Sequence, residues 1–246
     1  MKEYPDLFGE LRESLLDHAT ALTRKWCVPP EAFVDGKKRS DQYWIKTLAV
    51  EQGSSLDSAI AHLFLVGFQL TNRVAWDKEK VAEAMRGASA DADDAVSAVS
   101  SVASKLREAN HRGTQQTSAA SKIAFFARPS LEVYIWDRLA TKAARFREWD
   151  AGGRNQKLNL NVYVDAEKRH AYGDYWRSCK AASRQERECA DFTEAAKQLV
   201  LGFRAMSGPM SDAALIPDEF IERRLLDKLM FCEGLVLEGK DFRRFG

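Results

Sequence analysis

A lysine and an aspartate fifteen residues apart, Lys122 and Asp137, are the side chains of this chain best suited to chemistry. Ser118 is predicted to cap one helix, which puts Lys122 in its first turn, and Asp137 is predicted to cap the next helix. The positive end of a helix dipole favours a carboxylate and disfavours an ammonium. An amine there, partly buried by Phe125 and Ile135, is expected to have the lowered pKa that a nucleophilic lysine needs.

Two helices joined by a short link are expected to hold this pair. The first is predicted over Ala119–Ala127 and ends before Pro129, since proline lacks an amide hydrogen and biases the preceding residue away from helix. Leu131–Trp136 is rich in β-branched and aromatic residues and too short for a helix, so a buried extended segment is predicted there. A second helix is predicted over Arg138–Phe146. The pattern also fits a plain alternative, in which the aspartate is only a cap and the lysine only a surface residue.

The sequence from Ser121 to Asp137, SKIAFFARPSLEVYIWD, resembles the core of the helix-hairpin-helix DNA glycosylase superfamily, and is most similar to its 8-oxoguanine glycosylase branch. In that family a lysine opens the second helix of the hairpin. A proline and a short apolar run follow, and an aspartate then caps the next helix and serves in catalysis. The preceding loop, His111–Ala120, contains one glycine, Gly113, where the family's hairpin carries a Gly-x-Gly turn.

The resemblance implies a DNA glycosylase, with associated lyase activity, that acts on double-stranded DNA containing a damaged or modified base. A stacked base cannot be reached, so the nucleotide has to swing out of the duplex. Lys122, as a neutral amine, would attack the sugar carbon that bears the base, while Asp137 would stabilise the positive charge that builds on the sugar. This chemistry requires no metal and no organic cofactor. Both DNA repair and defence against foreign DNA, such as phage DNA, stay open as the biological role.

Two further groups of side chains are candidates for contacts with this substrate. The DNA-binding candidates lie in and after the expected hairpin turn: His111, Arg112, Gln115, Gln116, Ser118, Ser121 and Arg128. The candidates for a base pocket are aromatic rings able to stack on an extruded base: Trp44, Trp136, Tyr172 and Trp176. Because an aromatic residue at helical spacing more often belongs to a core, that alternative stays open for each ring.

Charge is distributed unevenly along the chain. The formal net charge is +1, but Ser104–Lys157 holds eleven Lys and Arg against five Asp and Glu, which leaves +6 in this stretch and −5 elsewhere. Backbone phosphates would select a local basic face of this kind. An ordinary solvated helix surface would give the same distribution.

Composition indicates a globular protein with a substantial core. Hydrophobic residues make up 45% and charged residues 30% of the chain. The four cysteines form no C-x-x-C pair, so no zinc or iron–sulfur spacing is present and free thiols are expected. The start of the chain is acidic and amphipathic rather than a signal peptide, and the most apolar run, Ala59–Leu70, is too short to cross a bilayer. We expect a cytoplasmic protein without membrane contact, nucleoid-associated if bacterial.

Helical periodicity dominates the rest of the chain. Further helices are predicted over Tyr4–Trp26, Ser40–Glu51 with Ser40 as its cap, Leu56–Asn72, Trp76–Arg86, Asp91–Asn110, Ala166–Ala182, Ala190–Met206 and Asp218–Val236. The expected fold is a single all-α domain over residues 1–246, a two-lobed helical bundle with a helix-hairpin-helix-like core. The lobes are expected at approximately 1–90 with 190–246, and at 91–189, with a cleft between them.

Two other classes of function fit the same residues. One is a non-catalytic helical DNA-binding module that keeps the hairpin for backbone contacts and shows salt-sensitive duplex binding without base excision. The other is a protein-interaction scaffold, in which the lysine and the aspartate are structural and no DNA is bound.

Overall fold

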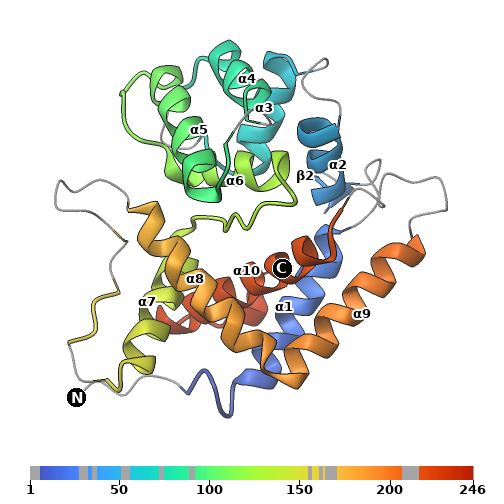
Figure 1. Cartoon of the computed structure of the whole chain (residues 1–246), viewed down its shortest axis with the longest axis vertical. Coiled ribbons are helices and arrows are strands. Elements are labelled where there is room, and N and C mark those ends of the chain that lie inside the picture. The colour runs from blue at the N-terminus through green and yellow to red at the C-terminus, as the bar shows by residue number, and fades with distance from the viewer. Residues whose placement is uncertain are drawn as a thin grey trace. The chain divides into compact units, whose positions relative to one another are not determined.

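The computed structural model describes residues 6–27, 33–34, 38–50, 56–71, 75–88, 92–154, 157–160, 163, 171–206 and 216–245. Over these residues the fold is all-α, as the sequence predicts (Figure 1). The helices are α1 (Arg12–Trp26), α2 (Asp41–Ile45), α3 (Ser58–Gly67), α4 (Lys78–Arg86), α5 (Ala95–Ala109), α6 (Thr117–Ala127), α7 (Arg138–Ala151), α8 (Tyr172–Arg187), α9 (Ala190–Met206) and α10 (Asp218–Leu237), with a π-helical turn η1 (Lys46–Val50) after α2 and a 3₁₀ turn η3 (Phe242–Arg244) after α10.

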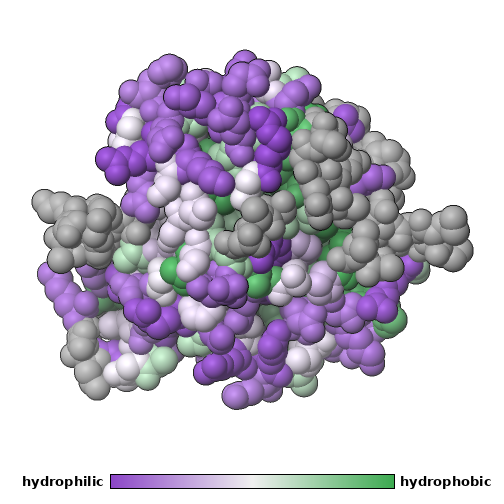
Figure 2. Space-filling model, turned by 45° about the horizontal axis from the view of Figure 1, so that its top comes forward, coloured by the Kyte–Doolittle hydropathy of each residue, from purple (hydrophilic) through white to green (hydrophobic). Residues whose placement is uncertain are grey.

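Strand structure is confined to one small hairpin in the described ranges. The two-residue strands β1 (Phe33–Val34) and β2 (Lys38–Arg39) pair antiparallel. Within the same ranges, every helix is too short or too polar to cross a bilayer. The face drawn in Figure 2 is largely hydrophilic, with hydrophobic residues visible only in small areas.

The chain divides into two compact units, each of which is described by itself. Unit 1 consists of Met1–Lys25, Trp136–Phe203 and Asp218–Gly246, and unit 2 of Trp26–Ile135 and Arg204–Pro217. These bounds differ from the expected lobes, because the chain changes unit at the end of α1, in the link between α6 and α7, and on both sides of Arg204–Pro217. Lys122 therefore belongs to unit 2 and Asp137 to unit 1.

In unit 2, polar side chains fix where the helices begin. Ser40 Oγ accepts a hydrogen bond from the Tyr43 amide at 3.1 Å, which confirms the predicted cap of α2. Asp57, Asp77 and Asp94 each accept bonds from two first-turn amides of α3, α4 and α5. Because aspartate is a strong N-cap, these helices begin later than hydrophobic periodicity alone predicted.

An aromatic core joins α2, α3 and α6 within unit 2. Trp44 meets Phe64 edge-on with ring centroids 4.9 Å apart. Phe64 lies 4.6 Å from Phe68, which in turn lies 5.6 Å from Phe126 on α6. Since Phe64 and Phe126 are fully buried, these contacts fix α6, the helix that carries Lys122, against the rest of the unit.

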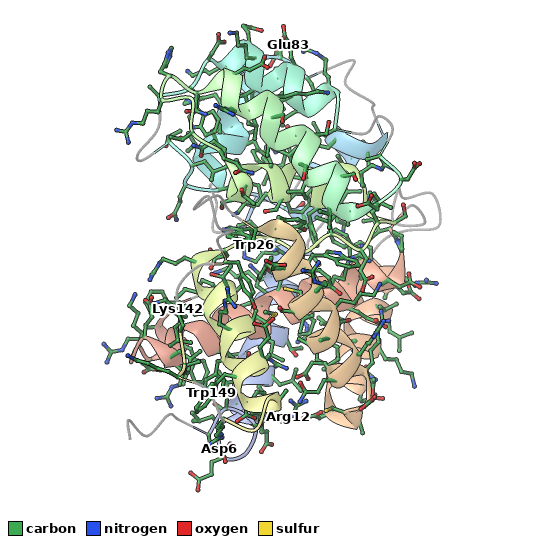
Figure 3. All side chains as sticks on the ribbon, turned by 60° about the vertical axis from the view of Figure 1, so that its left-hand side comes forward. Asp6, Arg12, Trp26, Glu83, Lys142 and Trp149 are labelled. Carbon is green, nitrogen blue, oxygen red and sulfur yellow. The ribbon has the colours of Figure 1, made fainter. Side chains whose placement is uncertain are left out.

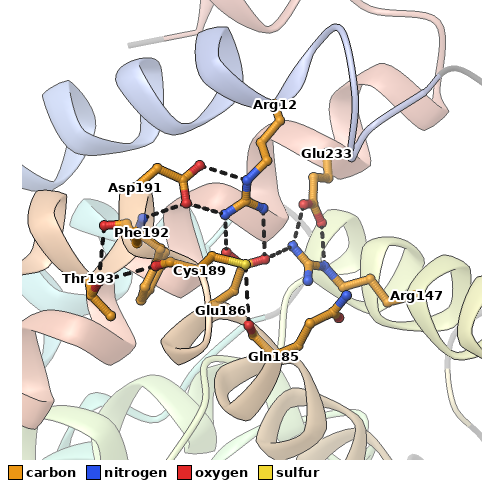
Figure 4. Close-up of polar contacts among 10 residues, drawn as sticks. Arg12, Arg147, Gln185, Glu186, Cys189, Asp191, Phe192, Thr193 and Glu233 are labelled. Atoms are coloured by element: carbon orange, nitrogen blue, oxygen red, sulfur yellow. Dashed lines mark hydrogen bonds and ion pairs between the residues drawn. The ribbon is translucent and has the colours of Figure 1, made fainter.

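In unit 1, buried charges hold α7 against its neighbours (Figure 4). Arg147 of α7 donates to Glu233 of α10 at 2.5 and 2.9 Å and to Glu186 of α8 at 2.9 Å. Glu186 also accepts from Arg12 of α1, which donates to Asp191 as well. Burial raises the pKa of Glu233, and the nearby Arg147 guanidinium opposes that rise. A change at Arg147, Glu186 or Glu233 would leave a buried charge incompletely paired.

This network explains why two helices run past their predicted ends. The sequence placed the end of one helix at Phe146, but α7 continues to Ala151 because Arg147 is held in the interior by two carboxylates. The helix predicted to end at Ala182 continues as α8 to Arg187 because Glu186 is buried among arginines. The predicted start of that helix, Ala166, lies outside the described residues.

Candidate functional site

The turn between α5 and α6 is organised by one buried side chain, Asn110. Its Nδ2 group donates to the carbonyls of Leu106 and Thr114 at 3.0 and 2.8 Å, and its Oδ1 accepts from the amides of Arg112 and Thr114 at 3.2 Å. Gly113 adopts φ of +60°, a conformation that glycine reaches without strain. The predicted pair of helices with a short turn is therefore present, and α5 packs along α6.

The outer residues of this turn are accessible. His111, Arg112 and Gln115 are exposed, as contact with DNA requires. Gln116 stands at the N-cap position of α6, but its side chain makes no capping bond and instead donates to Thr114 Oγ1 at 2.8 Å. The start of α6 therefore lacks the side-chain cap that α3, α4 and α5 have.

The prediction that Ser118 caps the helix is wrong. The helix begins at Thr117, so Ser118 is its second residue and Lys122 lies in the second turn rather than the first. The Lys122 side chain reaches back toward the start of the helix, and its Nζ donates to Ser118 Oγ at 2.8 Å and to Ser118 O at 3.4 Å. The amine is thus held near the first turn by a hydroxyl, although the backbone of Lys122 lies beyond the range of the dipole effect.

Two of the DNA-binding candidates on α6 have structural roles. Ser121 is fully buried, and its hydroxyl donates to Ser118 O at 3.1 Å, so its side chain is part of the helix packing and not of a DNA-binding surface. Arg128 ends α6, and its Nη2 donates to the Ala92 carbonyl at 2.9 Å. That bond ties the end of α6 to the segment before α5.

Asp137 caps α7, as predicted. Its Oδ1 accepts hydrogen bonds from the amides of Leu139 and Ala140 at 2.7 and 3.4 Å. The residues before it, Val133 to Trp136, are buried and lack regular secondary structure. The cap fixes the direction of the carboxylate at the start of α7.

A cluster of charges beside Asp137, which the sequence pattern did not predict, surrounds Glu238 just after α10. Its carboxylate accepts from Arg138, from Lys142 Nζ at 2.5 Å and from Lys240 Nζ at 2.8 Å. Burial alone would raise the pKa of Glu238, but these three bonds outweigh it and lower the pKa to about 2. The spacing of Arg138 and Lys142 on one helical face was the available sequence signal. The sequence did not show that Glu238 is their shared partner.

The rings proposed for a base pocket are mostly core residues. Trp44 is buried in the aromatic core of unit 2. Trp136 and Tyr172 are buried in unit 1, where the Trp136 ring centroid lies 5.2 Å from that of Tyr175. Trp176 is half-buried, with Lys180 Nζ 4.6 Å from its ring centroid. A base could stack on the three buried rings only if their packing opened, so Trp176 is the candidate best placed for contact.

One pocket of unit 1 lies at the C-terminal end of α7. It is lined by Arg145, Glu148, Trp149, Gly152, Lys157, Leu158 and Asn159. None of these is a predicted site residue. Figure 3 shows that Trp149, in this pocket, and Lys142, in the cluster around Glu238, stand toward opposite ends of α7. The pocket is therefore separate from the surface around Asp137.

Over the described part of the chain, no three His, Cys, Asp or Glu side chains are grouped in a way that would hold a metal ion. Of the thiols in these ranges, Cys179 and Cys232 are fully buried, and burial raises the pKa of both. Compared with known proteins, the sequence matches no protein-family model and no curated protein, and the fold matches no solved structure.

Proposed function

We propose that this protein is a DNA glycosylase with lyase activity, in which Lys122 is the nucleophile and Asp137 the stabilising carboxylate. The observation that supports the proposal is the order of the elements. A helical hairpin is followed by an amine on its second helix, then by a buried link, and then by a carboxylate that caps the next helix. This is the order that the resemblance to the helix-hairpin-helix glycosylases requires.

The proposed reaction joins the enzyme to the sugar. As the C1′–N bond to the base breaks, a bond forms between Lys122 Nζ and C1′. Positive charge develops on the sugar ring, and the Asp137 carboxylate stabilises it. The departing base takes up a proton, and the proton that the amine loses passes to Asp137 or to solvent. Ring opening then gives a Schiff base, from which β-elimination cleaves the strand.

The substrate of this proposal is duplex DNA with a damaged or modified base that is extruded before reaction. The exposed turn residues His111, Arg112 and Gln115 are suited to contacts with backbone phosphates.

Borohydride trapping tests the proposal. Duplexes with oxidised, deaminated or otherwise modified bases are incubated with the full chain and sodium borohydride, which reduces a Schiff base to a stable amine. We expect a covalent adduct with at least one lesion, and its complete loss in Lys122→Arg and Lys122→Ala. Lys105→Arg on the neighbouring helix α5 is the matched control and retains the adduct.

The outcomes separate the three classes of function. An adduct that survives Lys122→Arg removes this lysine as the nucleophile. Salt-sensitive duplex binding without excision on any lesion favours the non-catalytic DNA-binding module. If the protein neither binds nor modifies DNA, the interaction scaffold remains.

A further inference from the structure

The cluster of Arg138, Lys142, Glu238 and Lys240 is the most cationic group whose members are joined by direct contacts in the described part of unit 1. We name it the Glu238 cluster. Three cations share one carboxylate, so the cluster keeps a formal charge of +2.

The exposures of these side chains show which charges face solvent. The Glu238 side chain is 11% exposed, whereas those of Arg138 and Lys240 are 57% and 45% exposed. The carboxylate therefore lies beneath its partners, and the cations form the outer layer. An anion that approaches this surface meets positive charge first.

The position of Arg138 on α7 opposes the helix dipole. Arg138 is the first residue of the helix, while the last turn carries Glu148 and Asp150 and no basic residue. Cations near the start of a helix lower its stability, and anions near its end do the same. Arg138 at this position is unfavourable for α7 alone, and two carboxylates offset it, that of Asp137 at the cap and that of Glu238.

Glu238 also prepares the cations for binding. Lysine and arginine lose side-chain entropy when a ligand orders them, and this loss weakens binding. In the Glu238 cluster the three long side chains already converge on one carboxylate. Part of that entropy has therefore been lost on folding rather than on binding.

Two more cations extend this basic surface along the chain. Arg243 and Arg244 of η3 are 70% and 82% exposed, and both pair with the Asp241 carboxylate, which leaves one excess positive charge. Phe242 anchors this turn, since it is buried and its ring meets that of His18 on α1 edge-on at 5.5 Å. The end of the described chain is thus held to unit 1 and presents its arginines to solvent.

We propose that the Glu238 cluster binds backbone phosphates of the duplex beside Asp137. The inference rests on the proposed function, and it names the surface of unit 1 that receives the DNA. Arg138 adjoins Asp137 in the chain, so a phosphate bound by the cluster would lie near the carboxylate that acts on the sugar. A nucleic-acid backbone fits better than a small anion, because the cations spread over α7, the end of α10 and η3.

The salt dependence of duplex binding tests this inference without requiring catalysis. The variant Arg138→Gln/Lys142→Gln/Lys240→Gln is compared with wild type on an unmodified duplex at several salt concentrations. Each phosphate contact contributes about 0.9 to the slope of log K against log salt, so we expect the slope to fall by about 2 to 3. Affinity at low salt falls by at least tenfold.

The matched control removes the same charge elsewhere in unit 1. Arg184→Gln/Arg187→Gln/Lys197→Gln changes three exposed cations on α8 and α9, one of which, Arg187, is also paired with a carboxylate. We expect its slope to equal that of wild type. Circular dichroism and urea unfolding show whether both triple variants are folded. If the triple variant of the cluster does not fold, the single variants Arg138→Gln and Lys240→Gln provide the test, and each should reduce the slope by about 0.9.

The results keep this inference apart from the proposed function. If the triple variant of the Glu238 cluster binds duplex like the control variant, the cluster is not a phosphate-binding surface, even when wild type forms a borohydride adduct. If only the triple variant of the cluster loses duplex binding and wild type forms no adduct with any lesion, the cluster remains a DNA-binding surface and the glycosylase assignment is wrong. Absence of duplex binding by wild type overturns the inference.

Discussion

Gly234 of α10 lies against the backbone of Leu139 in the first turn of α7. A Cβ atom at position 234 would stand 2.3 Å from the carbonyl oxygen of Leu139 and 2.7 Å from its Cβ. Real Cβ atoms do not approach backbone so closely, so only glycine permits this contact. The contact brings α10 to the turn that Asp137 caps, and thereby sets the position of the carboxylate proposed to act on the sugar.

We therefore expect Gly234→Ala to destabilise unit 1 by about 1–3 kcal/mol, because the added methyl group forces α7 and α10 apart. Helix propensity alone predicts the opposite sign, since alanine is favoured over glycine in a helix by about 1 kcal/mol. Gly202→Ala in α9 is the matched control, because a Cβ there meets nothing within 4 Å. Urea unfolding of the two variants should give changes of opposite sign, and a stabilised Gly234→Ala variant would contradict the contact.

The two roles of Asp137 can be separated by substitution. Asparagine is as good an N-cap as aspartate, whereas alanine lowers stability by about 1 kcal/mol. Asp137→Asn should keep the stability and duplex affinity of wild type and lose base excision, while Asp137→Ala should lose both stability and excision. Urea unfolding and single-turnover excision on the same samples measure the two effects. Unchanged excision in Asp137→Asn would leave the residue only its capping role.

The hairpin turn should depend on Asn110. Alanine at this position leaves the amides of Arg112 and Thr114 without their acceptor, and we expect a loss of about 2–3 kcal/mol in the free energy of unfolding. Gln115→Ala in the same turn changes an exposed side chain and should stay within about 0.5 kcal/mol of wild type. Urea unfolding followed by tryptophan fluorescence compares the two variants. Equal stabilities would show that the side chain of Asn110 does not hold the turn.

Arg147→Met should destabilise the protein by about 3–5 kcal/mol, because Glu186 and Glu233 lose their shared partner in the interior. Adding Glu233→Gln to this variant removes one buried charge and should recover part of the loss. The control is Arg154→Met, which breaks an ion pair between an exposed arginine and Asp150 and should cost less than about 1 kcal/mol. A double-mutant cycle in urea measures the coupling, and a value near zero for Arg147 and Glu233 would contradict the network.

The Glu238 cluster should stabilise the fold in a pH-dependent way. The pKa of Glu238 is lowered from its ordinary 4.5 to about 2, so its contribution is fully present above pH 4.5. It is lost as the pH falls from 4.5 toward 2, where the folded state takes up the proton. Glu238→Gln should therefore be less stable than wild type at neutral pH, and the difference should shrink over this window. A difference that does not change with pH would show that the carboxylate is not coupled to its three cations.

Local sequence was sufficient for the fold class and for several helix boundaries. Proline at 129 ends α6, and Ser40 and Asp137 cap the helices that follow them, because capping and proline effects act within a few residues. Sequence also indicated a hairpin before Lys122. It misjudged the cap of α6, because the hydroxyl of Ser118 could bond either to a first-turn amide or to a side chain one turn later, and local pattern does not distinguish these choices.

Contacts between residues far apart in the chain were decided only by the tertiary structure. Arg138 and Lys142 meet Glu238 about one hundred residues later, and Gly234 meets Leu139. Neither contact can be predicted from the periodicity of the sequence, because each depends on how α7 and α10 cross. The sequence by itself determined which segments are helical and where an amine and a carboxylate stand along them. The tertiary structure decided which charges are buried, which cations share a partner, and that the amine and the carboxylate belong to different units.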